Sequence, residues 1–235
     1  LAGDDTFNGG NGDDQLDGDA GSDVANFTLR REDYLVGKTG AGFTVTAKTG
    51  GEGIDALTQV ESVGFSDLTL SLVRPPATQD AAFNTDPGFL FDFVFYQFAN
   101  TTDAGVLTPE QARDHYFAIG AGQGKAPNSW FDASYYENKW ADLKALDLDE
   151  ATLFAHYNRY GVWEGRSGGA DFDQFDGTRY LADNDAVAGY VDSHLSDFLG
   201  SRTNGAIAHF IIYGLAEGRA VYDTAGAAID LGWAL

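Results

Sequence analysis

Glycine and aspartate recur every nine residues at the start of the chain. Three successive nonapeptides keep one glycine and one aspartate at the same two positions, which are Gly3, Gly12 and Gly21 and then Asp5, Asp14 and Asp23. Glycine adopts positive φ angles readily, so a glycine-rich turn can direct its backbone carbonyls toward one point. Carboxylate and carbonyl oxygens are the ligands that calcium prefers. These residue types at this spacing therefore predict calcium sites in a series of repeated turns.

The nine-residue period also predicts how such turns are positioned. The residue two places after each aspartate is apolar, at Phe7, Leu16 and Ala25. Six residues of turn and three of strand account for the period, with the apolar residue facing inward. Successive turns then alternate between two sides, so Asp5 and Asp23 would share one ion. Asp14 would share another with a turn before Leu1. A flexible linker is the alternative, but a linker has no reason to keep three columns in register.

The stretch Gly9–Asp17 reads G-G-x-G-x-D-x-U-x, where U is apolar. It resembles the calcium-binding nonapeptide of RTX (hemolysin-type) proteins, which forms a parallel β-roll. The resemblance implies a short roll with bound Ca²⁺. The metal-site residues it implies are Gly3, Asp5, Gly10, Gly12, Asp14, Gly21 and Asp23. Phe27 replaces the next glycine, which indicates that the roll ends there.

Residues 28–72 are predicted to form short strands, because β-branched and aromatic stretches alternate there with glycine-rich turns. This order is similar to the β cap that follows the last repeat in exported RTX proteins. In that family a matching acidic position, here Asp55, is sometimes a further calcium ligand. The residues themselves favour a turn or strand-edge role for Asp55 and Glu61. The segment is expected to cover the end of the roll.

A second repeat follows, with the pattern H-[YF]-x-x-[YI]-G-x-x-[EQ]-G-[RK]. Its three copies are His115–Lys125, His156–Arg166 and His209–Arg219. A Phe-Asp pair precedes each copy, with an aromatic residue five positions after the phenylalanine. Each unit is predicted to contain two helices, and Asp149 is the expected N-cap of the second helix in the middle unit. The motif glycines Gly120, Gly161 and Gly214 are expected to end these helices in a left-handed conformation.

This second pattern resembles the HYxxxGxxEGR repeat of bacterial secreted and surface proteins, over about residues 89–222. That family implies no catalytic role. The three histidines lie in different units with no second ligand at metal-binding spacing, so we interpret them as packed residues bonded within their own unit.

The fold class is therefore expected to be mixed, α+β in separate domains: a short parallel β-roll with a β cap, then an all-α helical-repeat domain. The expected boundaries are 1–72 for the roll and cap, 73–88 for a Pro-Pro-containing linker and 89–222 for the repeats. Residues 223–235 are the tail, a candidate type I secretion signal. The chain begins inside a repeat without a signal peptide, so we expect a piece of a longer protein.

Composition excludes several function classes. The chain has 36 acidic and 14 basic residues among 235, a net charge of −22, which argues against nucleic acid as a partner. It has no cysteine, so thiolate catalysis is excluded. No apolar run reaches about 20 residues, so membrane insertion is not expected. Catalytic motifs such as G-x-S-x-G and the Walker loop are missing, and we expect no enzyme activity.

The sequence thus predicts the calcium-binding C-terminal region of a secreted or cell-surface RTX protein. Its folding would be driven by calcium after type I export, and its role would be adhesion or surface presentation. The alternative is a module that recognises a polysaccharide or another surface protein, attached to an upstream extracellular enzyme.

Overall fold

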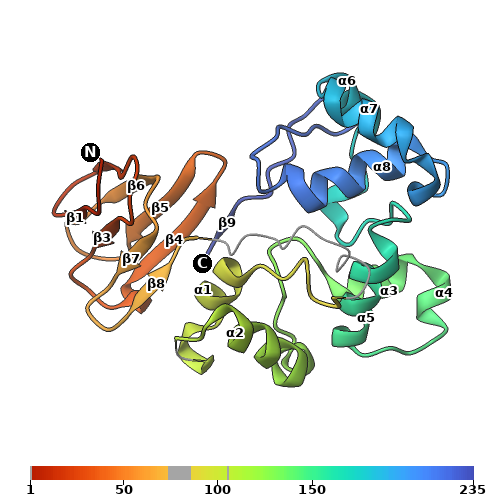
Figure 1. Ribbon diagram of the computed structural model, residues 1–235. Coiled ribbons are helices and arrows are strands. Elements are labelled where there is room, and N and C mark those ends of the chain that lie inside the picture. Colours follow the sequence, from red (N-terminus) through yellow and green to blue (C-terminus); the bar gives the residue numbers. More distant parts are fainter. Residues whose placement is uncertain (1, 74–85, 105) are drawn as a thin grey trace. The chain divides into compact units, whose positions relative to one another are not determined.

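The computed structural model describes residues 2–73, 86–104 and 106–235 (Figure 1). Strands occupy the region from residue 6 to 71, and helices occupy the region from 93 to 214, which confirms the mixed class. The expected linker at 73–88 lies mostly outside the described residues. The chain divides into two compact units, and residues 92–114 and 232–235 group with the β strands rather than with the remaining helices. This grouping differs from the division expected from the sequence.

The β strands form two sheets. They are β1 (Thr6–Asn8), β2 (Gln15–Asp17), β3 (Val24–Asn26), β4 (Tyr34–Thr39), β5 (Gly42–Ala47), β6 (Ile54–Thr58), β7 (Ser62–Gly64), β8 (Thr69–Ser71) and β9 (Trp233–Ala234). One sheet has the order β1-β3-β7-β8, and the other has the order β2-β6-β5-β4-β9. Strands that follow each other in the nonapeptide region therefore belong to different sheets.

Parallel pairing in the first sheet follows the nonapeptide period. β1 pairs with β3 so that Thr6 lies opposite Val24, an offset of two nonapeptides. β3 continues in parallel to β7, and β2 pairs in parallel with β6 in the other sheet. The residue in the middle of each strand points inward, and Ala25 of β3 and Val63 of β7 are both fully buried. β1, β2 and β3 are each three residues long, because glycine-containing turns separate them.

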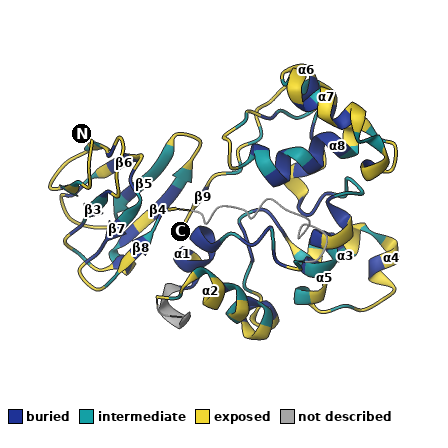
Figure 2. Cartoon of the chain, viewed as in Figure 1, coloured by how far each residue is buried: buried dark blue, intermediate teal, exposed yellow. Residues whose placement is uncertain are grey.

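The hairpin β4–β5 is inserted between β3 and β6 and pairs antiparallel with β6. It contributes Tyr34, Val36 and Val45 to a core that Leu57 of β6 completes. The last strand, β9, pairs antiparallel with β4 at the edge of this sheet. The end of the expected tail is thus part of the β unit. Figure 2 shows the buried positions of β4 and β7 against the exposed turns of the nonapeptide region.

The α-helices are α1 (Phe93–Ala104), α2 (Pro109–His115), α3 (Ala133–Lys139), α4 (Ala141–Lys144), α5 (Glu150–His156), α6 (Gly177–Ala182), α7 (Asp185–Ser193) and α8 (Arg202–His209). Short 3-10 turns occur at Arg31–Asp33, Ala121–Gln123, Ala170–Phe172 and Leu195–Phe198. None of the helices among the described residues has the length and apolar character that crossing a bilayer requires.

Each helix that carries a motif histidine continues into one π-helical turn. These turns are η3 (Tyr116–Gly120), η5 (Tyr157–Gly161) and η8 (Phe210–Gly214). The expected left-handed cap at the motif glycines is wrong. Gly124, Gly165 and Gly218, four residues later, have the positive φ angles instead. The residues directly after the motif glycines, Ala121, Val162 and Leu215, are still right-handed helical, so the chain reaches its left-handed residue about one turn later.

A tyrosine–histidine hydrogen bond explains the motif in the second and third units. Tyr136 Oη lies 3.0 Å from His156 Nδ1, and Tyr180 Oη lies 2.9 Å from His209 Nδ1. A Cβ on Gly161 would lie only 2.3 Å from Tyr136 Oη, so glycine makes room for that hydroxyl. The interpretation of these two histidines as packed residues bonded within their own units is confirmed.

Candidate metal centre

Three acidic residues stack on one side of the nonapeptide region. The register of β1, β3 and β7 places Asp5, Asp23 and Glu61 at equivalent positions, each directly before its strand. The Asp5 N–H donates to Asp23 Oδ1 at 2.7 Å, and the Asp23 N–H donates to Glu61 Oε2 at 2.7 Å. Each backbone thus holds the carboxylate of the next turn, which fixes the spacing of three negative charges.

Asp23 lies at the centre of this stack and is 0 % exposed. Its Oδ2 atom and the Oδ2 atom of Asp5 are buried and have no hydrogen-bond partner within the described residues. A buried carboxylate oxygen without a partner is costly, because it has lost its water and gained nothing in return. Two such oxygens on adjacent turns are free to bind a cation.

Gly18 adjoins the free oxygen of Asp23. A Cβ on Gly18 would lie 2.6 Å from Asp23 Oδ2 and 2.1 Å from the backbone carbonyl oxygen of Gln59. Gln59 has a φ angle of 50°, a left-handed conformation that is uncommon outside glycine. The carboxylate oxygen and the carbonyl oxygen therefore both approach the place that a side chain at Gly18 would occupy.

A second acidic pair lies in the turns on the other side. The parallel register of β2 and β6 makes Asp14 equivalent to Asp55, and the Asp14 N–H donates to Asp55 Oδ1 at 3.0 Å. Asp55 is 1 % exposed, and this burial raises its pKa, with the charges of Asp14 and Glu52 adding to the effect while the Asp14 N–H opposes it. Glu52 itself accepts hydrogen bonds from the hydroxyls of Thr28 and Tyr34.

The glycines of the motif allow the turns to stack in direct contact. Gly3, Gly10 and Gly12 have φ angles of 124°, 83° and 99°, in the region that favours glycine. A Cβ on Gly21 would lie 2.2 Å from the Gly3 carbonyl oxygen, so Gly21 is required by the close approach of two backbones. The Gly3 N–H donates to the Ala20 carbonyl at 2.8 Å across the same contact.

The site residues predicted from the sequence fall into two groups. Gly3, Asp5, Gly21 and Asp23 come together in the stack that contains Glu61. Gly10, Gly12 and Asp14 belong to the opposite turn, where the Gly12 N–H donates to the Gly51 carbonyl at 2.9 Å. Within the chain the neighbour of Asp14 is Asp55, on the side of β6, and the expected partner of Asp14 in a turn before Leu1 stays a prediction.

The site residues predicted from the sequence include neither Glu61 nor Asp55. The residues favour a turn or strand-edge role for both, and only the resemblance implies Asp55 as a further ligand. Both acidic residues are followed two positions later by an apolar residue, as in the nonapeptides, but they do not fall at the nine-residue period. Leu57 follows Asp55 by two positions and Val63 follows Glu61 by two, as Leu16 follows Asp14. The inserted hairpin changes the offset from 18 residues to 41 and 38, so a search at period nine cannot find them.

Within the described part of the chain, no group of three or more His, Cys, Asp or Glu side chains is placed to hold a metal ion. Calcium also takes backbone carbonyls as ligands. The carboxylates of Asp5 and Asp23, together with the backbone carbonyl of Gln59, therefore fit the chemistry of a calcium site. Comparison with known proteins adds nothing further: no protein-family model, curated protein or solved structure matches the chain.

Proposed function

We propose that the β unit binds Ca²⁺ in its stacked turns and that binding drives its folding. The observation that carries this proposal is the Oδ2 atom of Asp23, which is buried without a hydrogen-bond partner among the described residues, as is Oδ2 of Asp5 on the adjacent turn. The Gln59 carbonyl approaches the same place beside Gly18 as Asp23 Oδ2 does. A divalent cation would supply the positive charge that these oxygens lack. Asp5, Asp23 and the Gln59 carbonyl would hold one ion, with Glu61 nearby.

The same proposal interprets the strands as a short β-roll. Parallel pairing at an offset of two nonapeptides supports it, as does the assignment of β1 and β2 to different sheets. The inserted hairpin and β8 would then be its cap. Asp14 and Asp55 form a second candidate site on the opposite side, where burial and the neighbouring carboxylates raise the pKa of Asp55.

Calcium would act as a folding switch because of the charge of the chain. With a net charge of −22, the acidic turns repel one another in a compartment poor in calcium. Extracellular calcium sites typically bind with dissociation constants of about 10⁻⁴ to 10⁻³ M, so they fill outside the cell. Binding energy then becomes folding energy.

We further propose that the chain is a non-enzymatic region of a secreted or cell-surface RTX protein exported by a type I system. The helical repeats would serve adhesion or surface presentation. The nonapeptide pattern, the absence of cysteine and the acidic composition support this role.

Equilibrium calcium binding to the full chain tests the proposal. We expect Asp23→Asn to remove at least one calcium equivalent in isothermal titration calorimetry. Asp171→Asn is the matched control, because it makes the same charge change at an exposed residue of the helical unit. Equal calcium stoichiometry for both variants would contradict the assignment of Asp23.

A further inference from the structure

Arg159 has no acidic partner among the described residues, although the chain is strongly acidic. Five other arginines pair with carboxylates, namely Arg30, Arg166, Arg179, Arg202 and Arg219. Among the described residues Arg159 forms no hydrogen bond or ion pair, and its guanidinium lies 5.4 Å from the centre of the Tyr160 ring. Its charge is therefore available to a ligand.

The repeat itself does not require arginine at this position. The equivalent residues in the other two units are Ala118 and Ile212, and Ile212 is buried. The next residue, Tyr160, is 47 % exposed although the ring is large and partly apolar. An exposed Arg-Tyr pair thus distinguishes the middle unit from its neighbours, and structural need does not explain it.

Both residues line a cavity of about 370 Å³, which is within the range of small-molecule sites. One wall is a face of α5 and η5, because Thr152, His156 and Arg159 lie at helical spacing. The apolar lining consists of Pro87, Leu148 and Ala155. The cavity combines one unpaired cation, apolar surface and an exposed ring.

The polar groups of the cavity favour hydroxyl-bearing ligands. Asp86 lines it and accepts a hydrogen bond from the Gly88 N–H at 2.8 Å through Oδ1. Burial, with the charge of Arg166 adding, lowers the pKa of His156, so this ring is neutral at pH 7. The cavity therefore holds a single side-chain cation beside a carboxylate, which suits a singly charged ligand with hydroxyl donors better than a phosphate.

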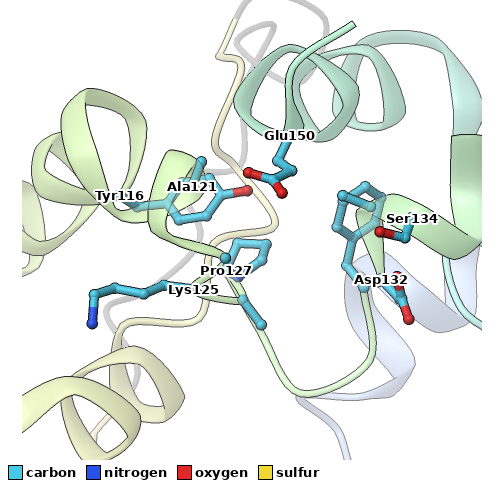
Figure 3. A pocket seen from close by; sticks show the side chains of 11 residues that line it. Tyr116, Ala121, Lys125, Pro127, Asp132, Ser134 and Glu150 are labelled. Carbon is cyan, nitrogen blue, oxygen red and sulfur yellow. The ribbon is translucent and has the colours of Figure 1, made fainter. Parts of the chain in front are cut away.

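A second cavity of about 320 Å³ in the same unit differs in chemistry (Figure 3). Glu150 and Tyr116 point toward one another at its upper edge, while Asp132 and Ser134 lie on the opposite side. Tyr116 is buried and Asp132 caps α3 through the Tyr135 N–H, so these groups are already used by the fold. This cavity offers no comparable free cation beside an exposed ring.

We propose that the cavity beside Arg159 binds a uronate, the carboxylated sugar unit of acidic polysaccharides. The guanidinium of Arg159 holds the carboxylate through paired N–H donors. The exposed surface of Tyr160 packs against the sugar ring, and the polar wall accepts sugar hydroxyls. This inference goes beyond the calcium proposal and does not depend on it.

The test is a titration of the full chain, by calorimetry or by NMR, with sodium glucuronate, glucose and inorganic phosphate. EDTA is present throughout one series and calcium in a second. We expect saturable glucuronate binding with a dissociation constant of order 1 mM, and glucose binding at least tenfold weaker. Persistence of glucuronate binding in EDTA separates this site from the calcium sites, whichever way the calcium proposal is decided.

We expect Arg159→Gln to weaken glucuronate binding about tenfold or more, because a charge-assisted contact is lost. Arg202→Gln is the matched control, because it removes the same charge at another exposed arginine of the helical unit, in the third repeat. Thermal melts check folding, and Arg159→Lys replaces Arg159→Gln if the latter melts early, with intermediate weakening expected. Unchanged affinity after removal of Arg159, equal binding of glucose, preference for phosphate, or no saturable binding of glucuronate would each overturn the proposal.

Discussion

At the scale of single residues, two glycines are required because neighbouring oxygen atoms occupy the place where a side chain would lie. A Cβ on Gly18 would collide with Asp23 Oδ2 and with the Gln59 carbonyl, and a Cβ on Gly161 would collide with the hydroxyl of Tyr136. The first contact belongs to the candidate metal centre and the second to the helical repeat. In both cases the glycine is required by a neighbouring oxygen, not by its own φ angle.

We predict that Gly18→Ala destabilises the β unit by about 1–3 kcal/mol, the usual range for overpacking. The added methyl group would collide with the Gln59 carbonyl and with the Asp23 carboxylate. Denaturant unfolding monitored by circular dichroism measures the change. Gly40→Ala is the control, because a Cβ there meets no atom within 4 Å. Equal stability of the two variants would refute the contact.

Protonation of two half-buried histidines, His156 and His209, should destabilise the helical unit at acid pH. Burial lowers the pKa of His156 and of His209, so the folded state binds protons less readily than the unfolded state. Their contribution to stability is complete above the unfolded value of about 6.5 and is lost as the pH falls toward the lowered folded values.

Urea unfolding at a series of pH values from 7.5 to 5 measures this loss as a falling free energy of unfolding. We expect His156→Gln to flatten the dependence, whereas His194→Gln, at a histidine outside the repeat motif, keeps it. A profile that His156→Gln leaves unchanged would show that the tyrosine–histidine contact is not the cause.

At the scale of elements, the second repeat is a helix pair joined by a packed tyrosine. The first helix begins at an aspartate N-cap, such as Asp132 for α3, and supplies Tyr136. The second helix supplies His156 and widens into η5, where Gly161 faces the tyrosine hydroxyl. The histidine and glycine of the motif are therefore explained by one side-chain contact between two helices, with the tyrosine of the first helix.

A double-mutant cycle tests that contact. We predict that Gly161→Ala costs about 1–3 kcal/mol in free energy of unfolding, through its clash with Tyr136 Oη. Adding Tyr136→Phe removes the hydroxyl and should recover part of the loss, so the two changes are not additive. Gly189→Ala in α7 has open space around it and should be neutral or stabilising. Strict additivity in the cycle would argue against a direct clash.

The last strand makes a further prediction at this scale. Trp233 of β9 is 9 % exposed and lies within about 6 Å of the ring centres of Phe43, Phe95 and Phe98. We expect Trp233→Ala to cost about 3–5 kcal/mol, as is typical for a buried aromatic residue. Leu146→Ala, at a residue 60 % exposed, is the control in the same unfolding assay. A loss below 1 kcal/mol would mean that β9 adds little to the β unit.

At the scale of the whole molecule, the features that could be predicted from the sequence are those that depend on a local repeat or a local capping residue. Period nine predicted the pairing of Thr6 with Val24, and helix-capping residues predicted the start of α5 at Asp149. Contacts that cross an insertion could not be predicted in this way. Glu61 and Asp55 join the acidic stacks only because the β4–β5 hairpin returns the chain to register, and Trp233 reaches β4 from almost 200 residues away.

The measurement that tests the central claim most directly is the thermal melt of the full chain in EDTA and in 10 mM CaCl₂, monitored by circular dichroism. Calcium sites of the extracellular class should stabilise the folded chain by about 1–3 kcal/mol per ion at that concentration. We expect calcium to raise the melting temperature of the natural chain and of Asp171→Asn, and to raise it less for Asp23→Asn. Identical melts in EDTA and calcium would contradict the proposal that the stacked turns bind calcium.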